Sequence, residues 1–350
     1  MSYTNGLDKP SDYFNTILWT GNGVDDRSIS GVGFQPDWVW YKERSSTSAH
    51  KLYDAVRTAT KELESNSNAA ESTNADALQA FETDGFQVGT HGSVNENGQT
   101  YVAWNWKAGT SVSGDTTGSG TLKTYTGSVN TTSGFSIIKY TGNGTAGHTI
   151  PHHLGVAPSA IFVKKLNELG DWSSYHSVLG NAGYMRLNNT NAFATASTYW
   201  NNTSPTSSVF TTGTTGNING SGSTYIAYCF AEKQGYSKFG SYTGNGNADG
   251  TFVYTGFKPA FVIAKESSEA RDWQLWDNKR LGYNASGGNK NLIPNKTDAE
   301  DTYADIDILS NGFKLRNSSA ADNKVSQTYI YMAFAENPFV TSTGVPATAR

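Results

Sequence analysis

Histidine can act as acid, base or metal ligand near neutral pH, and the stretch HTIPHH at residues 148–153 holds three of the six histidines. A zinc site needs three or four ligands at recognisable spacing. This stretch supplies no further ligand at such spacing. We therefore predict loop histidines here and no metal site.

Carboxylates are the second group that could do chemistry. The acidic stretch at residues 298–307 places Asp305 and Asp307 on one side of a predicted strand. Such a pair could hold a cation, but the central glycine and terminal glutamate of a calcium loop are missing, which favours a solvated loop or edge strand. No acid pair recurs in an aromatic setting, and there is no Gly-x-Ser-x-Gly elbow with a following acid and histidine. We predict a protein that is not an enzyme and uses no cofactor.

Two large rings, Tyr199 and Trp200, stand inside a polar loop, STYWNNTS, at residues 197–204. Exposed rings in a hydrophilic loop are typical of contacts with carbohydrate or protein. These two residues are the candidate binding site. A hydrophobic plug beneath a long loop is an equal alternative.

The elements that would position these residues belong to an internal repeat. TGNG stretches begin at Thr20, Thr141 and Thr243, and each is followed by Gly-x2-Pro-x5-Lys, two rings three places apart, a leucine-led segment and a closing Thr-Tyr segment. The lysines are Lys42, Lys164 and Lys265; the ring pairs are His50/Tyr53, Trp172/Tyr175 and Trp273/Trp276; the closing segments begin at Thr100, Thr224 and Thr328. TGNG lacks the lysine and helix of a phosphate loop, so it marks a turn.

Each unit has the pattern of a β-sandwich. The residues after each proline are bulky and apolar, as in a strand covered on both faces, and the closing segments alternate with a period of two. We expect the larger set to face the core: Val102, Trp104, Trp106; Ile226, Tyr228, Phe230; Ile330, Met332, Phe334. The lysines should extend their charge into water, and the ring pairs should pack inside the protein or at a sheet edge. The best helical segment is 74–81.

The predicted fold is therefore all-β, with three tandem antiparallel β-sandwich domains, jelly-roll or lectin-like and of one repeated type. They span 13–108, 139–235 and 236–338. Between the first two, 109–138 reads as a Gly/Ser/Thr-rich flexible linker with extra strands. Residues 1–12 and 339–350 are extended arms that could dock onto neighbouring subunits.

Composition limits the function classes. The net charge is −4 and no Lys/Arg cluster is present, which argues against nucleic acid as a partner. The single cysteine, Cys229, reads as a small apolar residue in a strand. The sequence shows no signal peptide and no run of about 18 apolar residues, so we expect a soluble protein made in a cytoplasm.

The tandem Gly-x2-Pro, ring-pair and Thr-Tyr units, separated by YTGNG, resemble β-sandwich repeats in tail-fibre and other virion structural proteins of marine tailed phages, cyanophages among them. The resemblance covers residues 13–339. It implies a non-enzymatic virion surface protein, such as a tail-fibre or tail-tip component in host attachment. Its implied partners are copies of itself, as in a trimer, other virion proteins, and a glycan or protein of the host surface. The alternatives are a capsid decoration, vertex or tail structural protein and, third, a polysaccharide depolymerase.

Overall fold

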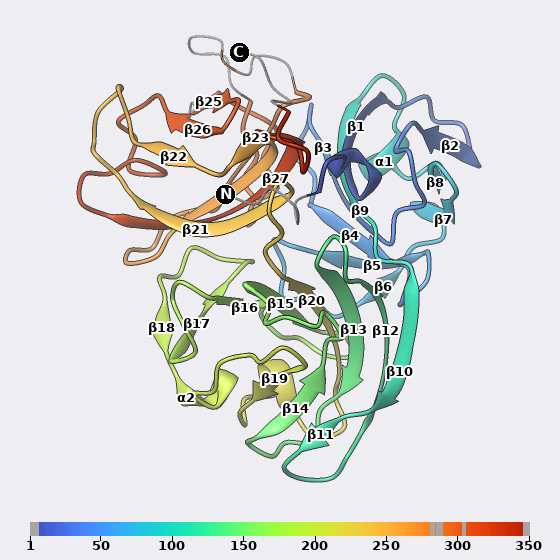
Figure 1. Ribbon diagram of the computed structural model, residues 1–350. Helices are drawn as coiled ribbons and strands as arrows, with labels where there is room; N and C mark the ends of the chain where they lie inside the picture. Colours follow the sequence, from blue (N-terminus) through green and yellow to red (C-terminus); the bar gives the residue numbers. More distant parts are fainter. Residues whose placement is uncertain (1–6, 281–283, 285–289, 303–305, 346–350) are drawn as a thin grey trace.

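The computed structural model describes residues 7–280, 284, 290–302 and 306–345. The prediction of an all-β, antiparallel fold is confirmed, because these residues form six sheets in which every strand pair is antiparallel. Figure 1 shows three lobes around a common centre, and each lobe holds one large and one small sheet.

The first repeat has a large sheet of order β1-β9-β3-β4-β5-β6 and a small sheet of order β2-β8-β7. The strands are β1 (Phe14–Thr20), β2 (Arg27–Ser30), β3 (Trp38–Glu43), β4 (Lys51–Asp54), β5 (Lys61–Glu64), β6 (Ser72–Thr73), β7 (Leu78–Glu82), β8 (Gly85–Val88) and β9 (Thr100–Trp106). A short 3-10 helix, η1 (Pro10–Asp12), precedes them, and α1 (Gly92–Asn95) leads into β9.

The second repeat has the order β10-β12-β13-β20-β15-β16-β17-β18 in its large sheet and β11-β14-β19 in its small sheet. The elements are β10 (Thr110–Asp115), β11 (Thr117–Gly118), β12 (Thr124–Asn130), β13 (Phe135–Thr141), β14 (His148–Pro151), β15 (Ala160–Lys165), β16 (Ser173–His176), β17 (Gly183–Arg186), β18 (Ala194–Thr195), α2 (Ser197–Trp200), β19 (Val209–Thr212), α3 (Gly216–Asn219) and β20 (Thr224–Phe230).

The third repeat has the orders β21-β27-β23-β24 and β22-β26-β25. Its strands are β21 (Ser237–Thr243), β22 (Phe252–Tyr254), β23 (Phe257–Glu266), β24 (Gln274–Asp277), β25 (Ile306–Leu309), β26 (Gly312–Leu315) and β27 (Thr328–Pro338). In all three repeats the closing strand lies between the opening strand and the strand that follows the proline.

Two local predictions are wrong. Residues 109–138 hold the extra strands that were predicted, but they are not a flexible linker, because β10 and β12 extend the large sheet of the second repeat and pair in register. The second repeat therefore includes all of β13, which begins at Phe135 and pairs with β20. Segment 74–81 is not helical, because a turn leads into β7 and Leu78 and Phe81 pair with β8. Packing of Leu78 against the sheet outweighs the helix propensity of the segment.

The terminal arms contact their own chain. The backbone N–H of Leu7 donates to the Gln234 carbonyl at 3.0 Å. The Asp8 carboxylate accepts hydrogen bonds from the Ser342 backbone N–H and hydroxyl. The remaining arm residues, 1–6 and 346–350, lie outside the described part of the chain.

The TGNG turns are held by a buried asparagine that precedes each closing strand. In the third repeat, Asn323 accepts from the Asn245 N–H at 3.0 Å and donates to the Asn247 carbonyl at 2.9 Å. Asn95 and Asn219 make the equivalent contacts in the other repeats. The first glycine is required, because a Cβ on Gly244 would lie 2.3 Å from the Lys324 carbonyl oxygen. This asparagine explains the recurrence of the four letters.

The large side chains of the closing strands are buried, but not inside separate sandwiches. They lie in one central core that all three repeats share. Each sandwich interior is filled by the other face, including Tyr101, Tyr225 and Tyr329. At the centre, equivalent rings meet pairwise: Trp106 and Phe230 at 6.4 Å between centroids, Trp106 and Phe334 at 5.5 Å, and Phe230 and Phe334 at 5.8 Å.

Replacing the asparagine should loosen one turn. Asn323→Ala removes a fully buried side chain that accepts from the Asn245 N–H and donates to the Asn247 and Asn317 carbonyls. We therefore expect the free energy of unfolding to fall by about 2 to 4 kcal/mol. Urea titration monitored by tryptophan fluorescence measures this. The control is Asn97→Ala, at an exposed asparagine in the first repeat, which should change stability by less than about 0.5 kcal/mol. Equal losses in the two variants would contradict the anchoring role.

Candidate functional site

Backbone hydrogen bonds and buried polar side chains join the repeats at the seams between them. One backbone hydrogen bond recurs at each: Glu71 N–H to the Leu166 carbonyl, Phe193 N–H to the Ser267 carbonyl, and Glu300 N–H to the Arg44 carbonyl. These bonds join repeats one and two, two and three, and three and one. The three repeats therefore form a closed ring.

The seam between repeats one and two contains a buried ion pair. Asp54, at the end of β4, binds the Arg57 guanidinium three residues later, and both side chains are fully buried. The Tyr228 hydroxyl of β20 donates to the same Asp54 carboxylate at 2.7 Å. A buried charge pair is tolerated when its remaining hydrogen-bonding sites are satisfied. Here the ring of one repeat satisfies the acid of another.

The seam between repeats three and one repeats this arrangement. Asp277, at the end of β24, binds Arg280 at 2.7 Å, and the Trp104 indole N–H donates to Asp277 at 3.1 Å. Arg44 adds a bidentate pair with Glu300, with both N to O distances at 2.9 Å. Asp54 and Asp277 begin the segments DAVR and DNKR. The Asp-x2-Arg spacing that these segments share is visible in the sequence, but we missed it there.

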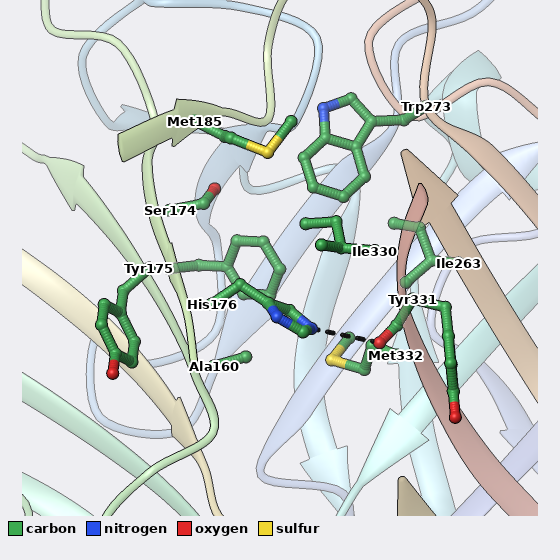
Figure 2. Close-up of a pocket in the computed structure, with 11 residues that line it drawn as sticks. Ala160, Ser174, Tyr175, His176, Met185, Ile263, Trp273, Ile330, Tyr331 and Met332 are labelled. Atoms are coloured by element: carbon green, nitrogen blue, oxygen red, sulfur yellow. Dashed lines mark hydrogen bonds between the residues drawn. The ribbon is translucent and has the colours of Figure 1, made fainter. Parts of the chain in front are cut away.

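The seam between repeats two and three has a histidine where the other two seams have the aspartate of the ion pair. His176 occupies the equivalent place and donates from Nε2 to the Tyr331 carbonyl at 3.2 Å, as the dashed line in Figure 2 shows. Beside it lies an apolar cavity lined by Met185, Ile263, Trp273 and Met332. Its free volume is about 20 Å³, which is room for one or two water molecules and too little for a substrate.

The three repeat lysines do not extend into water, so that prediction is wrong. Lys42, Lys164 and Lys265 are fully buried. Each ammonium donates to the carbonyl of the following residue, and Lys164 also donates across a seam to the Asn68 carbonyl at 3.3 Å. Burial lowers the pKa of each lysine to about 8. The carbonyls that receive them replace the water that a charged group normally requires.

The predicted binding residues Tyr199 and Trp200 are buried, 5% and 1% exposed. Tyr199 stacks on Tyr184 with ring centroids 3.6 Å apart, and Trp200 packs edge-on against Tyr175 and Phe210. The helix α2 turns both rings inward. The exposed-ring interpretation is therefore wrong, and the alternative of a hydrophobic plug describes them.

The other candidate groups have structural partners. His148 bonds to Asn219 and to the Thr116 hydroxyl at 2.7 Å. Asp307 pairs with Arg316 at 3.2 Å, while Asp305 lies outside the described residues. Cys229 is buried, and the ring pairs pack inside the protein as predicted. Among the residues that the structure describes, no group of three or more histidine, cysteine, aspartate or glutamate side chains could hold a metal ion.

Fold and seams together define a class: an all-β protein of three antiparallel double-sheet repeats closed into a ring around a shared core. The chain belongs to a family described as a domain of unknown function (DUF7483), whose model matches residues 9–338. No curated protein and no solved structure matches the chain. Within the described residues, no helix is long and apolar enough to cross a membrane.

The seam histidine predicts an acid dependence of stability. Burial lowers the pKa of His176 to about 4, below the value near 6.5 of an unfolded chain. Between these two pH values His176 is protonated in the unfolded chain and neutral in the folded chain. The free energy of unfolding therefore falls as pH drops from about 6.5 to about 4, by on the order of 3 kcal/mol for this residue.

Urea titrations across this pH range check the prediction. Carboxylates and other histidines also titrate there, so the informative quantity is the difference between the wild type and His176→Gln, which can still donate to the Tyr331 carbonyl. The variant should show a shallower loss. Parallel curves for the two proteins would contradict the role of His176.

Proposed function

We propose that the chain is a non-enzymatic component of a virion surface, in a tail fibre or tail tip, that takes part in host attachment. The tandem motifs support this through their resemblance to repeats of marine-phage virion proteins. The observation that carries the proposal is the shared core, which holds three sandwiches and their outer loops in one fixed arrangement. Loops held in a fixed arrangement suit multivalent binding, in which many copies on one particle each make a weak contact with the host.

A second candidate is a decoration or tail structural protein whose surfaces only bind neighbouring subunits. It is favoured by Phe252 and Tyr254, alternate residues of the short strand β22, which are 43% and 59% exposed. Exposed rings on a strand at a sheet edge suit contact with another chain. A polysaccharide depolymerase is the third candidate. Our proposal predicts that incubation of the chain with host surface glycans releases no shortened product, and this result would reject the depolymerase.

Adsorption competition tests the attachment role. Host cells incubated with the purified chain should bind a smaller fraction of subsequently added particles, because the chain occupies the receptor. The heat-unfolded chain at equal concentration is the control. Immunogold labelling of intact particles tests the location independently.

The outcomes separate the candidates. If particles carry the label but the purified chain does not change their adsorption, the chain has the structural role and not the attachment role. Particles that carry no label would contradict the virion proposal itself.

A further inference from the structure

We infer that the groove between repeats one and two is a binding site for a neutral, polyhydroxylated ligand, a segment of a saccharide chain. The inference rests on the proposed binding role and assigns its site and ligand class. The groove has a volume of about 490 Å³. It lies where the segment that only the second repeat contains, β10 to β12, faces the first repeat.

The floor of the groove is a patch of hydroxyl groups. Ser111 and Ser128 are directly paired across β10 and β12, and Ser113 is paired with Thr126. Alternation along each strand places these four side chains on one face. Ser128 accepts from the Gly109 N–H at 2.8 Å, whereas Ser111, Ser113 and Thr126 are exposed. Hydroxyls that both donate and accept are suited to sugar hydroxyls.

The opposite wall supplies the one charged group, Asp37. It is 6% exposed, and its Oδ2 accepts from the Ala108 N–H at 2.8 Å. Oδ1 has no hydrogen-bond partner among the residues that the structure describes, and Asp37 lines the groove. The equivalent positions, directly after the proline of each repeat, are Ser159 and Ala260. The acid thus departs from the repeat at the seam where the extra strands open a groove.

The lining selects among ligand classes. A carboxylate repels phosphate and sulfate groups, which excludes anionic ligands. One carboxylate with serine hydroxyls is a poor cation site, which normally takes several charged or carbonyl oxygens. The apolar side chains along the groove are those of Ala55 and Val56, because Val112 packs against the core of the second sandwich; these are too few for an apolar peptide. A neutral polyol remains, held by hydrogen bonds and therefore weakly, in keeping with multivalent use.

Binding should also depend on pH. Burial raises the pKa of Asp37 to about 6, while the bond from Ala108 and the charge of Lys107 oppose the rise. The nearby Asp54 adds to it, although Arg57 pairs with that acid. The ionised carboxylate accepts hydrogen bonds from sugar hydroxyls and the protonated acid loses an acceptor. Affinity should therefore fall as pH drops through about 6.

The test is nuclear magnetic resonance of the isotope-labelled full chain, titrated with neutral glucan, mannan and chitin oligosaccharides and with a sulfated oligosaccharide as the anionic comparison. At least one neutral probe should shift the amide signals of Ala108, Gly109 and Ser128, and the sulfated probe should not. Asp37→Asn should weaken that binding about tenfold or more and abolish its pH dependence. Asp84→Asn is the matched control, because Asp84 is an exposed acid that also bonds backbone amides.

The inference is overturned if no neutral probe shifts these signals, or if Asp37→Asn binds as the wild type does. These outcomes are distinct from failure of host attachment. A chain that blocks adsorption without groove shifts retains the attachment role and loses this site. A chain that binds saccharide in the groove without affecting adsorption retains the site and loses the attachment role.

Discussion

The contact among Trp106, Phe230 and Phe334 is the constraint on which the rest of the structure depends. These equivalent rings lie on the closing strands of the three repeats and meet at the centre of the molecule. Because each large sheet buries one face against its own small sheet and the other against its neighbours, no repeat can expose its closing strand without uncovering large rings. Burial of each such ring stabilises the fold by about 1.5 to 3 kcal/mol.

The seams add specificity to this apolar centre, and they differ from one another. Two carry a buried Asp–Arg pair completed by Tyr228 or Trp104 of another repeat. The third carries neutral His176 beside a small apolar cavity. In each of these two seams the buried acid takes its third hydrogen bond from a ring of one particular neighbouring repeat. The differences also make the surface asymmetric: the inserted strands β10 and β12 form one wall of the groove beside Asp37. The corresponding groove between repeats three and one is lined by Ala260 in place of the acid.

The sequence predicted the repeat, the strand type and the buried rings because period-two alternation and turn residues act locally. It did not predict the shared core, because alternation shows that a face is buried but not what covers it. The same limit explains Lys42, Lys164 and Lys265, whose burial depends on carbonyls brought close by the seams. Tyr199 and Trp200 were predicted to be exposed because they lie in a polar stretch. That stretch forms the four-residue helix α2, which points both rings into the protein. Asp37 differs from the equivalent residues of the other repeats, but its place in a groove depends on where the inserted strands lie, which the sequence does not show.

Scanning calorimetry of the full chain tests the central claim that the three repeats share one core. The account predicts a single transition whose van't Hoff and calorimetric enthalpies agree, since loss of one repeat exposes the rings of the other two. Two or three resolved transitions, each with the enthalpy of about one third of the chain, would show that the repeats unfold independently and would contradict it.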